Sequence, residues 1–358
     1  MIDIGGLGQR RVASERVQRL LVAMTNAELV NLIQAGEALG SGIGGSRSLV
    51  LVDGVAVFVK LVPLTDLEQL PENAGSTANL FDLPMDCQYG VGGPSFSGWR
   101  EVAASVMATG WVTSGACGSF PMLHHWRPLS MPAFGGPLPD ELGDIDEMVL
   151  RWGGSSAVRR RAEAIAESAS SLALFFEFIP QLLSDELSQL LASDQLTDAV
   201  LEATLSDLLC ATAVMNSAGL MHFDTHFGNI LSAAQNLYVA DFGLALSSSF
   251  DLTQSEANFL DANGSHDTAY VTTRMVNWIV SSVGQLADWE PRYEAIRDIA
   301  SGESAKYVVP GPGAAIVERF AGVASIVNAF YEQRHGDDRT EPYPSARIEA
   351  AFAAATTQ

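Results

Sequence analysis

Positive charge is scarce in this sequence. Its 358 residues include 20 lysines and arginines against 42 aspartates and glutamates, which gives a formal net charge of −22 at pH 7. Nucleic acids need a basic surface to neutralise their phosphates, and anionic membranes attract basic segments, so the charge balance argues against both partners. An acidic surface suits a cationic partner or substrate, or serves solubility alone.

Lysine in particular is almost absent. It occurs only at Lys60 and Lys306, and arginine supplies the remaining positive charges. A lysine inside an apolar segment is therefore conspicuous in this chain.

Cysteines and long hydrophobic runs are also scarce. Cys87, Cys117 and Cys210 are far apart and show no paired spacing, which indicates neither a disulfide framework nor a zinc site and favours a reducing compartment. The N-terminal stretch lacks the apolar core of a signal peptide. The apolar run LVLVDGVAVFVKLV is broken by Asp53 and Lys60 before it reaches membrane-spanning length. We therefore expect a soluble, cytoplasmic protein.

The front of the chain combines helical and β-rich patterns. A helical pattern runs from about residue 14 to residue 39 and contains a capping box formed by Thr25 and Glu28. A glycine-rich stretch at 40–46 breaks this pattern. Two β-rich runs, SLVLV and VAVFVKLV, follow and are joined by Asp-Gly at 53–54, which is a strong hairpin signal.

The middle of the chain is less regular, because two stretches rich in glycine and proline interrupt it. We expect an irregular insertion at 63–98, a helix at 99–112, a second irregular insertion at 113–143, a helix at 144–171 and a buried strand at 172–180.

Helical patterns dominate the rest. A long amphipathic helix, LTDAVLEATLSDLLCATAVMNSAGL, should end at Gly219, and residues 244–358 read mostly as helices and loops. This distribution predicts an α+β chain in which a small lobe precedes a larger helical lobe. The expected divisions are an N-terminal helical extension at 1–36, the small lobe at 37–179 and the helical lobe at 180–358.

A glycine motif and the strand lysine come next to each other. Gly40, Gly42 and Gly45 form G-x-G-x-x-G, and β-rich sequence follows it, whereas a dinucleotide-binding motif would open a helix. Such a loop can lie over phosphates because its backbone N–H groups can approach them, although an ordinary turn is the alternative. Lys60 ends VFVK, where a buried ammonium would need phosphate and a carboxylate as partners; the alternative is a side chain that reaches solvent.

Glu101, in the helical segment GWREVA, is the expected carboxylate partner of Lys60. This ion pair would orient the ammonium towards a phosphate group. Glu68 and Glu72 are competing carboxylates.

The strongest signal is the segment HFDTHFGNIL followed by ADFG. Phosphoryl transfer needs a carboxylate that accepts the proton of the attacking hydroxyl, together with oxygen ligands for Mg²⁺. Asp224 fits the first role, and Asn229 and Asp241 fit the second.

A zinc site is the competing interpretation of this segment. His222, Asp224 and His226 are metal-ligating types, but Gly228 and the β-rich run after it indicate a loop rather than a helix, and a further ligand is not evident. Elsewhere, the neighbours His124 and His125 read as ordinary loop or fold histidines.

Over roughly residues 37–285 these motifs resemble the protein-kinase-like superfamily, closest to its aminoglycoside phosphotransferase, choline kinase-like and atypical kinase branch. The resemblance implies a bilobed fold with a five-stranded antiparallel sheet and one key helix in the N-terminal lobe, a hinge, and a mainly helical C-terminal lobe. It implies that ATP and Mg²⁺ bind between the lobes. The segment FFEFIP matches the hinge, so the backbone of Glu177, Phe178 and Ile179 should contact adenine, and Phe58, on the same strand face as Lys60, should stack on it.

Three details bear on the acceptor. Phe223 stands where protein kinases typically have an arginine, which argues against control by a phosphorylated activation loop. His226 and Gly228 match the form common in small-molecule and atypical kinases. Asp-Phe-Gly at 241–243 is instead the protein-kinase form, but no A-P-E motif follows it.

The expected function is therefore an ATP- and Mg²⁺-dependent phosphotransferase acting on a hydroxyl group. A small-molecule acceptor is favoured, and the acidic charge would suit a cationic, antibiotic-like compound. The alternative is an atypical protein Ser/Thr kinase. A pseudokinase that serves as a binding module and a kinase fold that transfers AMP are further alternatives.

Overall fold

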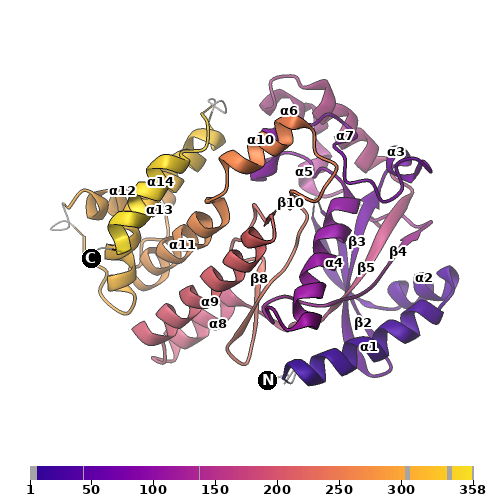
Figure 1. Ribbon diagram of the computed structural model, residues 1–358, viewed down its shortest axis with the longest axis horizontal. Coiled ribbons are helices and arrows are strands. Elements are labelled where there is room, and N and C mark those ends of the chain that lie inside the picture. The colour runs from indigo at the N-terminus through magenta and orange to yellow at the C-terminus, as the bar shows by residue number, and fades with distance from the viewer. Residues whose placement is uncertain (1–5, 43, 137, 303–306, 337–340, 357–358) are drawn as a thin grey trace. The chain divides into compact units, whose positions relative to one another are not determined.

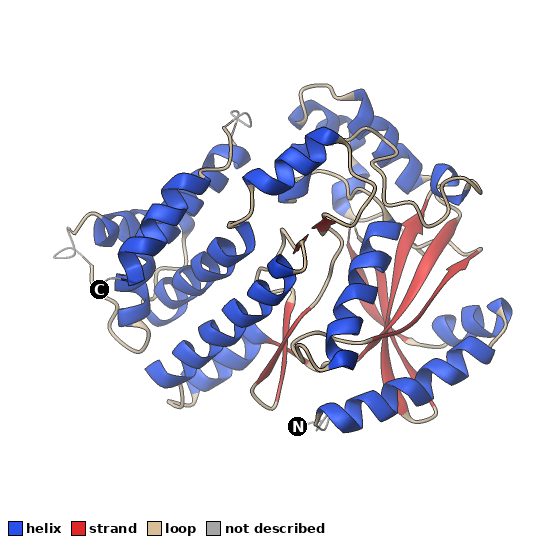
Figure 2. Cartoon of the chain, viewed as in Figure 1, coloured by secondary structure: helices blue, strands red, loops and turns tan. Residues whose placement is uncertain are grey.

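A five-stranded antiparallel sheet forms the β-rich part of this α+β chain, and helices make up most of the remainder (Figures 1 and 2). The computed structural model describes residues 6–42, 44–136, 138–302, 307–336 and 341–356. The chain forms two units: unit 1 contains Met1–Pro180 and Ala240–Ala257, and unit 2 contains Gln181–Val239 and Asn258–Gln358.

The sheet belongs to unit 1 and has the order β1-β2-β3-β5-β4. Its strands are β1 (Glu37–Gly42), β2 (Gly45–Val52), β3 (Val55–Leu64), β4 (Leu123–Leu129) and β5 (Ser170–Glu177). The predicted hairpin is confirmed between β2 and β3. Asp53 and Gly54 both have positive φ, 51° and 79°, as the tight turns that suit twisted hairpins require.

The glycine-rich stretch at 40–46 was expected to break a helical pattern, but its described residues end β1 and begin β2. These strands pair with each other, and Gly42 lies opposite Gly45. Glycine tolerates positive φ. Gly40 (98°) follows an irregularity in the pairing between Ala38 and Gly40, and Gly45 (121°) begins β2.

Helices cover both faces of this sheet (Figure 2). Helices α1 (Leu7–Ala23) and α2 (Asn26–Gln34) lie on one face, and α4 (Gly98–Ser114) lies on the other. The single helical pattern expected at 14–39 is two helices, because Thr25 caps α2 in the predicted capping box with Glu28.

Alternation along β3 assigns its side chains to the two faces. Val57, Val59 and Leu61 belong to the core beneath α1 and α2, whereas Val62 belongs to the core beneath α4. Lys60 has the parity of Val62, so its side chain lies on the α4 side of the sheet. The strand is apolar almost throughout because helices cover both of its faces.

Two predictions for the middle of the chain are wrong. The stretch 113–143 is not irregular throughout, because it contains β4, which pairs with β5 and includes His124 and His125. The helix expected at 144–171 is broken into α6 (Ile145–Arg151) and α7 (Ser156–Ala166), because positive φ at 153–154 (62° and 78°) cannot continue a helix.

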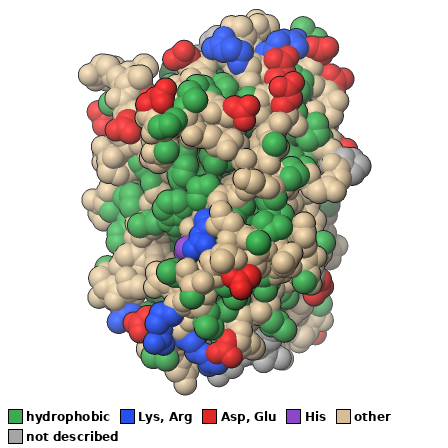
Figure 3. Space-filling view, turned by 90° about the vertical axis from the view of Figure 1, so that its right-hand side faces the viewer, with side chains coloured by type: hydrophobic (Ala, Val, Ile, Leu, Met, Phe, Trp, Pro, Cys, Tyr) green, Lys and Arg blue, Asp and Glu red, His purple; other side chains and the backbone are tan. Residues whose placement is uncertain are grey.

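Short elements outside the sheet form a further core of unit 1. They are α3 (Asp66–Gln69), the 3₁₀ helix η1 (Met85–Tyr89), α5 (Asp140–Gly143), α6 and α7. Arg161 and Glu68 form an ion pair of 2.9 Å inside this part, and both side chains are almost fully buried. Figure 3 shows the side on which α2, β4 and α7 lie. Hydrophobic side chains gather across its middle, where basic and histidine side chains also show, and most other charged side chains lie towards its upper and lower margins.

Unit 2 is mostly helical and has one small antiparallel sheet of order β6-β8-β9. Its elements are β6 (Gln181–Leu182), α8 (Leu183–Ala192), α9 (Asp198–Ser217), β7 (Leu220–Met221), β8 (Ile230–Ala233), β9 (Asn236–Val239), α11 (His266–Trp278), the π-helix η2 (Ile279–Val283), α12 (Trp289–Ala300), α13 (Ala314–His335) and α14 (Ser345–Thr356). Strand β10 (Leu246–Ser247) belongs to unit 1, and α10 (Gln254–Ala262) continues from unit 1 into unit 2. The long helix predicted before Gly219 is confirmed as α9.

Within the described ranges, α13 is the one helix whose length and apolar composition would suit a membrane span. Half of its most apolar window is buried, and it packs against α11, α12 and α14.

Candidate active site

The strand lysine of unit 1 lies between two carboxylates. Lys60 is only 5% exposed, and its Nζ lies 2.7 Å from Glu101 Oε1 and 2.7 Å from Asp241 Oδ1. The predicted pairing of Lys60 with Glu101 is present. The competing carboxylates lie elsewhere, since Glu68 pairs with Arg161 and Glu72 is exposed.

The two carboxylates differ in their exposure to solvent. The side chain of Glu101 is 3% exposed, whereas that of Asp241 is 40% exposed. Asp241 also has a positive φ of 66°, an uncommon conformation for aspartate that concentrates at functional sites. The Lys60 site is therefore reached from solvent on the side of Asp241.

Burial and charge pull the pKa values of this cluster in opposite directions. Burial alone lowers the pKa of Lys60, but Asp241 and Glu101 outweigh that effect, so the net shift is upward and the ammonium stays charged. Burial raises the pKa of Glu101 to about 7, Asp241 acts in the same direction, and Lys60 opposes both. The cluster thus holds a charged ammonium between two carboxylates, of which the buried one, Glu101, has the raised pKa.

Two glycines lie next to this cation. A Cβ on Gly44 would lie 3.5 Å from Lys60 Nζ, and a Cβ on Gly243 would lie 3.8 Å from Lys60 Nζ and 3.2 Å from Asp241 Oδ1. Gly45 meets a different neighbour, since a Cβ there would lie 1.9 Å from the carbonyl oxygen of Leu61. Gly44 and Gly243 thus bring backbone without side chains close to the buried ammonium.

The predicted adenine contacts lie around the end of β5. Phe58 is half-buried on β3 opposite Phe176, and Phe178 is likewise half-buried, whereas Ile179 is 5% exposed. The backbone N–H of Glu177 donates to the carbonyl of Met122 at 2.9 Å.

The side chain of Glu177 has a partner that sequence reasoning missed. Arg10, on α1, donates to both of its carboxylate oxygens at 2.8 Å, and it also donates to the carbonyls of Gly118 and Phe120. These bonds fix the end of β5 to α1. An arginine on an amphipathic helix gave no signal of this role.

The second set of predicted residues lies in unit 2, in the loop between β7 and β8. Asn229 Nδ2 donates to Asp224 Oδ2 at 2.9 Å and to the Asp224 carbonyl at 3.0 Å. The amide nitrogen of Asn229 is therefore engaged, and its amide oxygen is the atom with metal-ligating chemistry. The Asp224 side chain is 30% exposed, so a solvent-borne group can approach its carboxylate.

The histidines of this loop orient Asp224. His226 Nδ1 accepts from the Gly228 N–H at 3.0 Å, so the neutral ring is assigned a proton on Nε2, which lies 3.5 Å from Asp224 Oδ1. A Cβ on Gly228 would lie 2.8 Å from the His226 ring, which explains the glycine. His222 Nδ1 accepts from the Asp224 N–H at 3.2 Å.

Asp267, on α11, anchors the same loop and was not found by sequence reasoning. Its carboxylate accepts the N–H groups of His222 (2.7 Å) and Phe223 (2.9 Å). Burial alone raises the pKa of Asp267, but the bonds and charges of His266 and His222 hold it below its usual range. Phe223 has φ of 63°, and these bonds hold its strained backbone in place. The available signal was that Asp267 is the one acidic residue of α11.

The predicted residues thus form two clusters. Lys60, Glu101 and Asp241 meet in unit 1, and Asp224 meets Asn229 in unit 2. Among the described residues no three or more His, Cys, Asp or Glu side chains are grouped as a zinc site would need. Mg²⁺ needs no such cage, since one or two oxygen ligands from the protein suffice beside phosphates and water.

No protein-family model matches this chain, and no curated protein matches its sequence.

Proposed function

We propose that this protein is an ATP- and Mg²⁺-dependent phosphotransferase that moves the γ-phosphate to a hydroxyl group. The observation that carries the proposal is the Lys60 ammonium, which is buried, permanently charged and held at 2.7 Å by both Glu101 and Asp241. In this proposal the chain is a bilobed, protein-kinase-like enzyme in which unit 1, although the larger of the two units, serves as the N-terminal lobe and unit 2 as the mainly helical C-terminal lobe.

The residues of unit 1 would bind and orient the nucleotide. Lys60 would give up part of its contact with Asp241 to phosphate oxygens, and the glycine hairpin would cover the phosphates with backbone N–H groups. Glu101 would keep the ammonium in place. Phe58 and the backbone of residues 177–179 would hold the adenine.

The residues of unit 2 would act on the acceptor. Asp224 would orient the attacking hydroxyl and accept its proton on a carboxylate oxygen, while His226 and Asn229 hold that carboxylate in position. Asn229 and Asp241 are the proposed ligands of Mg²⁺, which when bound neutralises charge on the phosphates.

A small-molecule acceptor is the proposed substrate class, and the cytoplasm is the proposed location. Phe223 is buried against the rings of His266 and Phe259, so no cation stands before Asp224 to bind a phosphorylated loop. The net charge of −22 would favour a cationic metabolite.

The test incubates purified protein with γ-labelled ATP, Mg²⁺ and a cell lysate separated into small molecules and proteins. We expect label in a small molecule; labelled protein would instead identify a protein kinase. A parallel incubation with α-labelled ATP tests for transfer of AMP. Label in the acceptor from α-labelled ATP, or no ATP consumption with any fraction, would contradict phosphoryl transfer.

Matched variants locate the chemistry. Asp224→Asn should lower kcat by about 10²–10⁴-fold with nucleotide affinity retained, because it removes only the proton acceptor. Lys60→Met should weaken nucleotide binding as well. Asp185→Asn, an exposed aspartate on α8, is the control and should match the wild type. Equal activity of Asp224→Asn and wild type would remove Asp224 from the mechanism.

A further inference from the structure

Arg100, the residue before Glu101 on α4, is a buried cation that phosphoryl transfer does not account for. It is 1% exposed, its Nη2 lies 2.5 Å from Glu256 Oε1, and its Nε donates to the Thr77 carbonyl at 2.6 Å. Glu256 is also 1% exposed, and its other oxygen accepts the N–H and the hydroxyl of Thr253, each at 2.9 Å. The carboxylate is therefore held on both sides.

The surroundings of Arg100 make this pair rigid. The guanidinium lies 5.0 Å from the Phe96 ring and 5.8 Å from the Phe250 ring. Burial lowers the pKa of Arg100, while Glu256 and Asp251 oppose that effect. Removing one member of such a pair leaves a buried charge uncompensated, so the two groups keep each other in one geometry.

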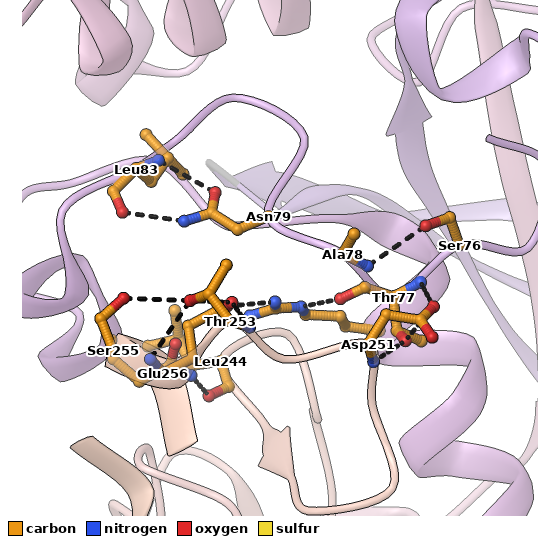
Figure 4. Close-up of polar contacts among 12 residues, drawn as sticks. Ser76, Thr77, Ala78, Asn79, Leu83, Leu244, Asp251, Thr253, Ser255 and Glu256 are labelled. Carbon is orange, nitrogen blue, oxygen red and sulfur yellow. Dashed lines mark hydrogen bonds and ion pairs between the residues drawn. The ribbon is translucent and has the colours of Figure 1, made fainter. Parts of the chain in front are cut away.

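The segment after Asp241 is fastened at two more points. Asp251 and Thr77 exchange three hydrogen bonds, from the Thr77 hydroxyl and N–H to Asp251 Oδ2 and from the Asp251 N–H to Thr77 Oγ1 (Figure 4). Gln88, which is fully buried, donates to the Leu244 carbonyl. The stretch predicted as an insertion at 63–98 thus contacts the segment 244–256 at Leu244 and Asp251, and α4 contacts it at Glu256.

We propose that Arg100, Glu256, Asp251 and Thr77 form a clamp that fixes α4 to the segment following Asp241, and so keeps Glu101 and Asp241 on either side of Lys60. The reason is geometric. Glu101 follows Arg100 directly, and the ties at Asp251 and Glu256, together with that at Leu244, hold the segment that follows Asp241. These four are positioning residues. The expected effect of the clamp on turnover rests on the proposed function, whereas its effect on the position of Lys60 does not.

The test uses the scarcity of lysine. Because the sequence has only Lys60 and Lys306, protein labelled with ¹⁵N-lysine gives two side-chain ammonium signals, and Lys60→Arg assigns them. We expect Glu256→Gln and Asp251→Asn to shift the Lys60 signal and to speed its hydrogen exchange with water by about 10-fold, the scale of coupling between packed elements. Arg100→Lys keeps the charge but loses the planar fork. It also adds a third ammonium signal, so the Lys60 signal is reassigned in this variant, and its shift then reports position rather than charge.

Controls and turnover separate this proposal from the proposed function. Glu72→Gln changes an exposed carboxylate of the same insertion and should leave the Lys60 signal unchanged. In turnover, Asp251→Asn should lower kcat, and this effect should disappear in a Glu101→Gln background, because both act through one contact.

The proposal of a clamp is contradicted if Glu256→Gln and Asp251→Asn fold like the wild type and show the same Lys60 chemical shift and hydrogen-exchange rate as the wild type. Should Glu256→Gln fail to fold, Asp251→Asn decides, since Asp251 is exposed. If the wild type neither binds nor consumes ATP, the proposed function fails, while the ammonium signal still decides the clamp.

Discussion

At the scale of single residues, buried cations are the features that need the most compensation. Four of them each have a carboxylate within 2.9 Å: Lys60 with Glu101, Arg10 with Glu177, Arg100 with Glu256 and Arg161 with Glu68. An isolated buried charge would cost several kcal/mol, so these pairs serve geometry more than net stability. Lys60 alone among them also contacts a solvent-accessible carboxylate, that of Asp241, which is why it is the candidate for binding an anion.

His124 provides a pH-dependent test of the same packing. It is 3% exposed on β4, its Nδ1 lies 2.8 Å from Ser14 Oγ, and its Nε2 has no hydrogen-bond partner among the described residues. Burial lowers the pKa of His124 to about 4, and Glu177 opposes this shift. His124 therefore takes up a proton near pH 6.5 in the unfolded chain but only near pH 4 in the folded chain.

We expect the contribution of His124 to be fully present above pH 6.5 and lost as the pH falls towards 4, by at most about 3 kcal/mol. The free energy of unfolding, measured in urea at pH 7.5 and at pH 5, should fall less between these two pH values in His124→Asn than in the wild type. His335→Asn, an exposed histidine on α13, is the control. The same pH dependence in His124→Asn and wild type would show that burial does not depress this pKa.

Most of the candidate cluster in unit 1 could be predicted from its residues, because Lys60, Glu101 and Asp241 lie in segments with strong local patterns. The partners of Arg10, Arg100 and Asp267 could not be. Arg100 and Glu256 are 156 positions apart, and the chain has 42 acidic residues, so nothing local indicates which one an arginine meets.

At the scale of elements, the glycine hairpin of β1 and β2 shows which glycines the fold requires. The motif G-x-G-x-x-G treats Gly40, Gly42 and Gly45 alike. In the structure Gly45 has φ of 121° and no room for a Cβ, whereas a Cβ on Gly42 would meet nothing within 4 Å.

Gly45→Ala should therefore destabilise unit 1 by about 2 kcal/mol or more, because the strand must move away from Leu61 and the backbone is strained. Gly42→Ala is the matched control and should change stability by at most about 0.5 kcal/mol. Urea unfolding measures both. Equal stability of the two variants would mean that the hairpin adjusts freely.

Strand β4 and the break between α6 and α7 show where element prediction failed. The run LHHWRPL lacks a clean alternation and lies among prolines and glycines, so its strand exists because β5 offers an edge to pair with. The paired glycines at 153–154 were a breaker signal within a long helical pattern.

At the scale of the whole molecule, the excess of negative charge acts on stability. A net charge of −22 on 358 residues repels itself in the folded state. Raising NaCl from about 0.01 M to about 1 M shortens the screening length from about 30 Å to about 3 Å. We expect the melting temperature to rise by a few degrees over this range.

A variant with less negative charge is the control for the salt effect. Glu15 and Glu72 are exposed, so Glu15→Gln combined with Glu72→Gln should start from a higher melting temperature and gain less from salt. A melting temperature that is unchanged or falls with salt would show that charge repulsion does not limit stability.

The sequence by itself determined the α+β composition, the Asp53–Gly54 hairpin, the capping box of α2, and the residue types of both candidate clusters. Each depends on neighbours within a few positions, which periodicity and turn chemistry describe. Only the tertiary structure decided that β4 joins the sheet, that Gly45 and not Gly42 is sterically required, and that Asp267 and Glu256 hold the loop and the helix of the candidate sites. These features depend on groups brought together from distant parts of the chain. A buried charge or polar group needs a partner, and the tertiary fold determines which residue that partner is.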